Sequence, residues 1–163
     1  MTTRLCSSNS LSDPCAALSR GRILVADDEP LIRNLNAEVL LDAGYQVDVA
    51  EDGAVAWAAL QLYSYDLLIT DNAMPSVSGL ELIKQLKAAG LELPIIMATG
   101  SLPEAEFARS PWLQPNAVLL KPYPLNGLLG VVRNVLNHFA SAPPAIAALS
   151  GWQPQLVAIG LRL

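Results

Sequence analysis

The sequence predicts an α/β fold in which five parallel strands form one doubly wound sheet with helices on both faces. Two observations lead to this prediction. From Gly21 to Ala140, short apolar runs alternate regularly with segments of helical periodicity. Several of these runs are apolar at every position, as expected for strands buried on both faces of a parallel sheet. Strands that alternate with helices pair in parallel through right-handed crossovers.

Composition narrows the classes of protein that fit. The chain has 163 residues, 52% of them apolar and 15% charged, which favours one compact domain over disorder. The net charge is −5 and the basic residues are scattered, so no basic patch is present for a nucleic acid partner. No apolar stretch approaches the roughly 18 residues of a membrane span. The first twenty residues do not resemble a secretory signal, so we expect a cytoplasmic protein.

Two terminal segments lack the alternating pattern. Residues 1–20 are serine-rich and predict a flexible leader, in which Cys6 and Cys15 are expected to be free thiols. Residues 21–140 form the predicted domain. Residues 141–163 are apolar and carry one charged side chain. We expect this tail to be mobile, although packing on the domain or binding to a partner or membrane surface stays open.

The first half of the domain predicts strand, helix, strand and helix in that order. Ile23 to Ala26 form the first strand, and Val47 and Val49 mark the second. Pro30 suits the first turn of a helix that ends at Gly44, and Asp52 can cap an alanine-rich second helix. The apolar positions expected on the inner side of these two helices are Ile32, Leu35, Val39, Trp57 and Leu60.

The second half repeats the alternation three times. The predicted strands are Leu67–Thr70, Pro94–Ala98 and Ala117–Leu120. Ser78 and Glu81 have the spacing of a capping box at the start of the third helix. Three prolines between residues 101 and 116 predict a short fourth helix, Glu104 to Arg109. The last helix opens near Pro124, with an apolar stripe at Leu125, Leu128, Leu129, Val132, Leu136 and Phe139.

Polar residues follow four of the predicted strands. Asp27 and Asp28 follow the first strand, Asp71 the third, Thr99 the fourth and Lys121 the fifth. With the first and third strands adjacent, the three carboxylates converge. Two carboxylates about 4 Å apart repel by about 4 kcal/mol at an effective dielectric of about 20, so a cation is needed. Mg²⁺ fits best, and together with a carboxylate nucleophile, a lysine and a hydroxyl it describes a phosphoryl-transfer site.

These residues also carry a resemblance. The segments ILVADDEP, YDLLITDNAMP followed by SGLELI, LPIIMATG and LLKPYP resemble the receiver domain of bacterial two-component response regulators, over roughly Arg22 to Phe139. The resemblance implies a flavodoxin-like sheet of order 2-1-3-4-5. It implies that Asp71 accepts a phosphoryl group from a phosphohistidine on a sensor histidine kinase or a histidine phosphotransfer protein. The domain would then signal by contact with an unidentified downstream protein. Whether the chain forms a homodimer is left open.

The resemblance also implies a role for each site residue. Asp28, Asp71 and the backbone carbonyl of Ala73 would ligate Mg²⁺, and Asp27 would act through a bound water. Lys121 would pair with the phosphoryl oxygens, and Thr99 would donate a hydrogen bond to one of them. The Lys121–Pro122 peptide bond is expected to be cis. The chain would thus be a stoichiometric acceptor and not a turnover enzyme.

The chain departs from the family in two features that matter for signalling, the proline-broken segment 101–116 at the place of the fourth helix and the residue at position 118. Receivers usually carry Tyr or Phe three residues before the lysine, where this chain has Val118, and Tyr123 cannot be assumed to replace that aromatic ring. Two alternative functions stay open, a detached receiver of a hybrid histidine kinase and an interaction module that works without phosphorylation. A phosphatase with an aspartate nucleophile is disfavoured, because Ala73 stands where a second catalytic acid would be.

Overall fold

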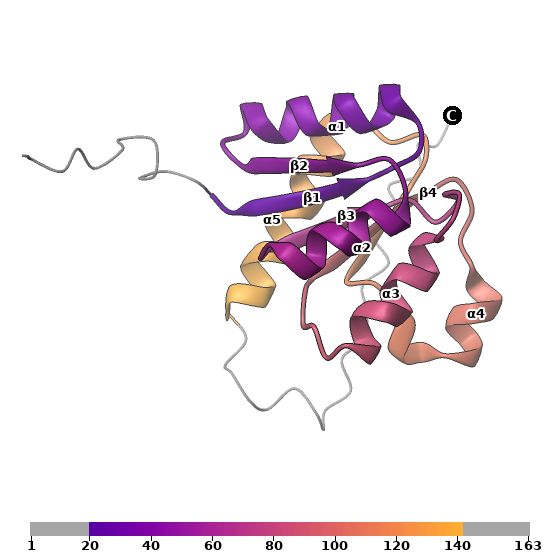
Figure 1. Ribbon diagram of the computed structural model, residues 1–163. Helices are drawn as coiled ribbons and strands as arrows, with labels where there is room; N and C mark the ends of the chain where they lie inside the picture. The colour runs from indigo at the N-terminus through magenta and orange to yellow at the C-terminus, as the bar shows by residue number, and fades with distance from the viewer. Residues whose placement is uncertain (1–19, 142–163) are drawn as a thin grey trace, which may run out of the picture.

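A computed structural model of the chain describes residues 20–141. The strands are β1 (Arg22–Ala26), β2 (Gln46–Ala50), β3 (Leu67–Thr70), β4 (Ile95–Thr99) and β5 (Ala117–Leu120). The helices are α1 (Pro30–Asp42), α2 (Gly53–Leu62), α3 (Gly79–Ala88), α4 (Glu104–Arg109) and α5 (Leu125–Ser141), with a short 3-10 helix, η2 (Pro111–Leu113), after α4. The strands form one parallel sheet of order β2-β1-β3-β4-β5, which confirms the predicted fold (Figure 1).

The predictions for both termini concern residues outside this range. The leader, with Cys6 and Cys15, and the tail lie outside the described residues, apart from Arg20 and Ser141 at their inner ends. Their proposed roles therefore stay predictions. Within residues 20–141, no helix has the length and apolar character needed to cross a membrane.

The sheet separates two apolar layers because successive side chains of a strand point to opposite faces. Leu24 and Leu68 belong to the layer under α2, α3 and α4, whereas Ile23 and Ile69 belong to the layer under α1 and α5. Figure 1 shows these two groups of helices on opposite sides of the sheet. The central strands β3 and β4 are buried at every position, which explains their uninterrupted apolar sequences.

Predicted helix boundaries agree with the observed hydrogen bonds. Asp52 accepts a hydrogen bond from the Val55 N–H at 2.8 Å and caps α2, and Ser78 accepts from the Glu81 N–H at 3.2 Å and caps α3. Gly44 adopts a φ of +90° just beyond the end of α1, a conformation that glycine reaches without strain. The short fourth helix spans the predicted residues.

Two expected apolar stripes were wrong in part. In α1 the buried residues are Asn36, Ala37 and Leu40, whereas the expected Leu35 is exposed. Helix α1 has apolar residues around much of its circumference, so periodicity alone did not identify the inner side. In α5 Phe139 is also exposed, because it lies near the end of the helix. Of the two aromatic residues around α4, Phe107 is buried and Trp112 in η2 is 59% exposed.

Candidate functional site

The register of the sheet brings the sequence-predicted polar residues to one edge. Ala26 of β1 pairs with Thr70 of β3, so Asp27 and Asp71 occupy equivalent positions just beyond neighbouring strands. The Asp71 N–H donates to the carbonyl of Ala26 at 2.9 Å and extends this pairing by one residue. Lys121 follows Leu120, the partner of Thr99 in β4, in the same way. Parallel strands thus deliver the three side chains to the carboxyl edge of the sheet.

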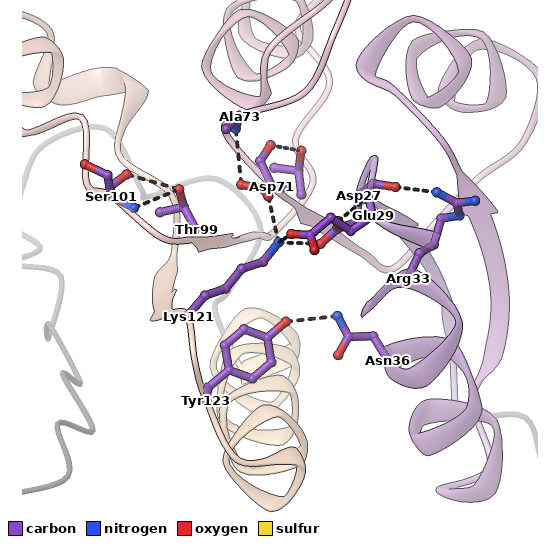
Figure 2. A network of polar contacts seen from close by, with 11 residues as sticks. Asp27, Glu29, Arg33, Asn36, Asp71, Ala73, Thr99, Ser101, Lys121 and Tyr123 are labelled. Carbon is purple, nitrogen blue, oxygen red and sulfur yellow. Dashed lines mark hydrogen bonds and ion pairs between the residues drawn. The ribbon is translucent and has the colours of Figure 1, made fainter. Parts of the chain in front are cut away.

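Lys121 bridges two carboxylates at this edge. Its Nζ atom lies 2.7 Å from Asp71 Oδ2 and 2.8 Å from Asp27 Oδ2 (Figure 2). Asp27 and Asp71 are 2% and 5% exposed, and the Lys121 side chain is 13% exposed. Two carboxylates at such depth need a compensating cation, because ionised groups lose their hydration on burial. The ammonium of Lys121 supplies one positive charge for two negative ones.

Burial and the neighbouring carboxylates have opposite effects on the pKa of Lys121. Burial alone would lower this pKa, because it disfavours the charged ammonium. The hydrogen bonds and charges of Asp27 and Asp71 outweigh the effect of burial, so the pKa is raised above the ordinary value for lysine. Lys121 is therefore a fixed positive charge at neutral pH.

Asp28 completes an acidic cluster on the outer side of the site. One carboxylate oxygen from each of Asp27, Asp28 and Asp71 falls within 4.8 Å of the others, and Asp28 is exposed. Hard cations such as Mg²⁺ select oxygen ligands of this type and keep part of their hydration shell. The cluster carries three negative charges against the one of Lys121, so its donor chemistry fits a divalent cation.

The backbone around Asp71 is held by the start of α3. The Ala73 N–H donates to Asp71 Oδ1 at 3.1 Å, and the Thr70 hydroxyl donates to the Asp71 carbonyl at 2.9 Å. A Cβ atom on Gly79 would overlap that carbonyl oxygen, so the close approach of α3 requires glycine. Asn72 also accepts a hydrogen bond from the Leu80 N–H at 3.1 Å. These contacts fix the main chain on both sides of the carboxylate.

Thr99 lies at the same edge, but its hydroxyl is engaged elsewhere. Its Oγ1 donates to the carbonyl of Ser101 at 3.0 Å and accepts from the Ser101 N–H at 3.4 Å. Figure 2 shows the Thr99 hydroxyl turned toward Ser101. The structure thus brings Asp27, Asp28, Asp71 and Lys121 into one cluster. Thr99 ends a strand at the same edge of the sheet, and its hydroxyl is bonded within its own loop. The Lys121–Pro122 peptide bond is cis, as the resemblance implied.

The sequence did not identify two residues near the acidic cluster, Arg33 in α1 and Glu29 just before this helix. Arg33 donates from Nη1 to the carbonyl of Asp27 at 2.7 Å and so holds the loop that presents the acidic pair. Glu29 Oε1 lies 3.9 Å from the Lys121 ammonium on the exposed side. Arg33 stands one turn into the helix that follows the acidic loop, and this spacing could have suggested its role.

The sequence matches a family of known proteins over most of the described residues. The family model described as "Response regulator receiver domain" matches residues 23–133, which include every residue of the cluster. The chain belongs to this family.

Individual receiver-containing proteins are similar over most of the described residues. The chain is 31% identical over 150 residues to the alkaline phosphatase synthesis transcriptional regulatory protein SphR of Synechococcus elongatus, covering 85% of this chain and 58% of that protein. It is 39% identical over 106 residues to the sensor protein EvgS of Escherichia coli K12, covering 65% of this chain and 9% of that protein. The chain therefore spans just over half of the length of the first curated relative and a small part of the length of the second.

Solved receiver structures are also similar. The chemotaxis response regulator CheY4 of Vibrio cholerae has a TM-score of 0.66 and 30% identity, covering 73% of this chain and 99% of that one. The response regulator TrrA of Thermotoga maritima, solved in complex with Mg²⁺ and BeF, has a TM-score of 0.61 and 33% identity, covering 70% and 97%. The receiver fold thus accounts for nearly all of the described residues.

Proposed function

We propose that this chain is a cytoplasmic, Mg²⁺-dependent phosphoacceptor in which Asp71 takes a phosphoryl group from a phosphohistidine donor. The observation that carries the proposal is the position of one carboxylate oxygen of Asp71. It lies 2.7 Å from the Lys121 ammonium, inside a cluster of three aspartates at the carboxyl edge of the sheet. A carboxylate can act as a nucleophile toward phosphorus when nearby cations neutralise the charge that is transferred.

In the proposed step, a carboxylate oxygen of Asp71 forms a bond to phosphorus while the P–N bond of the donor breaks. The bonding pair returns to the imidazole nitrogen of the donor, and Asp71 becomes an acyl phosphate. Lys121 already contacts this carboxylate, so its ammonium is in place to pair with the phosphoryl oxygens. Thr99 would donate its hydroxyl to one of those oxygens after giving up its bond to Ser101. The protein accepts one equivalent and does not turn over a substrate.

The residues that would hold the metal ion are Asp27, Asp28, Asp71 and the carbonyl of Ala73. Bound Mg²⁺ would supply positive charge for the transferred group. Asp28 gives the sharpest test of this assignment because it is exposed, so Asp28→Asn has little cost for folding. We expect Asp28→Asn to weaken Mg²⁺ binding by at least about tenfold in isothermal titration calorimetry. Asp42→Asn, at the far end of α1, is the matched control and should bind as the wild type does.

A small phosphodonor tests the central assignment without knowledge of the natural partner. The protein is incubated with Mg²⁺ and phosphoramidate, and its intact mass is measured. We expect a gain of one phosphoryl group that is absent from Asp71→Asn and retained in Asp42→Asn. A gain that survives in Asp71→Asn contradicts the assignment of Asp71, and no gain in the wild type contradicts the proposed function.

The donor in the cell would be a sensor histidine kinase or a histidine phosphotransfer protein, and the output would be contact with a downstream protein. The similarity to a segment of the sensor protein EvgS favours a second candidate, in which this chain is a detached receiver of a hybrid kinase. The two candidates share the chemistry at Asp71 and differ in the partner. An interaction module without phosphorylation would keep all partner binding and signalling in Asp71→Asn.

A further inference from the structure

One buried polar contact lies outside the acidic cluster and is not used by the proposed chemistry. Within the described residues, the buried polar or charged side chains are Asp27, Asn36, Thr70, Asp71 and Thr99. Four of them stand at or beside the strand ends that form the site. The fifth, Asn36, is 2% exposed and lies on the inner side of α1, where an apolar residue is expected. A buried amide is costly unless it is hydrogen-bonded, so its partner is informative.

The partner of Asn36 is the segment that carries Lys121. Asn36 Nδ2 donates to the hydroxyl of Tyr123 at 2.9 Å, between residues 87 positions apart (Figure 2). Tyr123 follows Lys121 by two residues and packs against the apolar layer under α1 and α5. Burial raises the pKa of Tyr123, against the lowering effects of the Asn36 hydrogen bond and the Lys121 charge. The hydroxyl is therefore neutral, and available to this bond, at neutral pH.

The segment from Lys121 to Pro124 has few other anchors. Two of its four residues are prolines, which have no N–H to donate. Among the backbone hydrogen bonds of the described residues, the Lys121 N–H donates to the Thr99 carbonyl at one end of this segment. At the other end, the Pro124 carbonyl accepts from the Gly127 and Leu128 N–H groups. The side chain of Tyr123 is the tie between the middle of this segment and α1.

Helix α1 therefore contacts both the loop that carries Asp27 and the segment that carries Lys121. Arg33 holds the carbonyl of Asp27, and Asn36, three residues later, holds Tyr123. We propose that Asn36 and Tyr123 form a positioning pair that holds the Lys121 ammonium against Asp71. The pair acts through Lys121 and does not touch the reacting atoms. This inference rests on the proposed function, because its effect is measured on phosphorylation of Asp71.

Tyr123→Phe removes the hydroxyl, keeps the ring and so preserves the apolar packing. We expect phosphorylation by phosphoramidate with Mg²⁺ to slow by about fivefold, the kinetic equivalent of one hydrogen bond. Asn36→Leu should slow the reaction by a similar factor, and the double variant Asn36→Leu/Tyr123→Phe should be no slower than either single variant. Tyr45→Phe is the matched control, because Tyr45 is buried in the same layer near the other end of α1. It should react as the wild type does.

A structural role and a positioning role are separated in a Lys121→Ala background. If the hydroxyl acts through Lys121, Tyr123→Phe has no further effect on the phosphorylation rate once the ammonium is gone. An equal slowing in both backgrounds, or no slowing in the wild-type background, overturns the proposal. Unfolding in urea of every variant verifies that the rates are compared on folded protein. A wild-type chain that is not phosphorylated at all refutes the proposed function instead, so the two failures are distinguishable.

Discussion

Lys121 and Asp71, 50 residues apart in the chain, form an ion pair of 2.7 Å between Nζ and Oδ2. The same ammonium contacts Asp27 at 2.8 Å, so it holds together two buried carboxylates that repel each other. Its position follows from the pairing of β4 with β5, since Lys121 comes directly after the partner of Thr99. In the proposed function, an acyl phosphate on Asp71 would use the same contact with the Lys121 ammonium.

Removal of the ammonium should destabilise the metal-free protein. Lys121→Met leaves Asp27 and Asp71 buried without their shared cation, and we expect a loss of about 3–5 kcal/mol in the free energy of unfolding. Mg²⁺ should restore part of this loss by binding to the folded acidic cluster. Urea unfolding with EDTA and with Mg²⁺ measures both effects. A variant as stable as the wild type in EDTA would show that the ion pair does not contribute.

The stabilisation by Lys121 has a defined pH window. Burial alone would lower its pKa, but the hydrogen bonds to Asp27 and Asp71 raise it above the ordinary value of 10.5. A raised pKa contributes its full stabilisation below the unfolded-state pKa and loses it as pH rises through the folded-state pKa. The difference in unfolding free energy between wild type and Lys121→Met, measured in EDTA, should be constant from about pH 7 to 9.5 and shrink above about pH 10.5. A difference that already declines below pH 9 contradicts this linkage.

The close approach of α3 to Asp71 should tolerate no side chain. Gly79→Ala places a Cβ against the carbonyl oxygen of Asp71, so we expect a loss of about 1–3 kcal/mol in stability and slower phosphorylation. Gly130→Ala is the control, because nothing lies within 4 Å of the added Cβ and the residue is inside α5. It should be neutral or stabilise by up to about 1 kcal/mol. Equal effects of the two substitutions, measured by urea unfolding, would count against the packing argument.

The lifetime of the acyl phosphate should depend on residue 73. Ala73 is exposed beside Asp71 and offers no side-chain group to orient an attacking water. Ala73→Asn introduces an amide at this position, and we expect decay of the phosphorylated protein to accelerate by roughly fivefold, about one hydrogen bond to that water. Ala88→Asn, exposed at the far end of α3, serves as the control. Unchanged or slower decay in Ala73→Asn is the contrary result.

The sequence predicted the elements that depend on local signals. Strand ends, caps such as Asp52 and Ser78, and the proline-limited α4 follow from residue type and spacing, and the parallel register then carries Asp27, Asp71 and Lys121 together. Contacts that depend on helix rotation or on a rotamer were not predictable in this way. Leucines lie around much of the circumference of α1, so the sequence did not show which side of the helix faces the sheet. The hydrogen bond between Asn36 and Tyr123 was therefore missed.

The orientation of Thr99 belongs to the same group of unpredicted contacts. Its bond to Ser101 is a choice among side-chain rotamers within one loop, which no sequence pattern specifies. Val118 is half-buried against the layer under α2, α3 and α4, where most receivers carry an aromatic ring. The aromatic residue of the segment that carries Lys121 is Tyr123, and its hydroxyl accepts a hydrogen bond from Asn36 of α1.

The most direct test of the account is to identify the phosphorylated residue. The protein is incubated with Mg²⁺ and phosphoramidate, treated with borohydride, which reduces an aspartyl phosphate to homoserine, and digested for peptide mass mapping. The account predicts conversion at Asp71, dependent on Mg²⁺ and on the phosphodonor, with Asp27 and Asp28 unmodified. Conversion at another residue, or none when the folded protein has been exposed to both reagents, contradicts it.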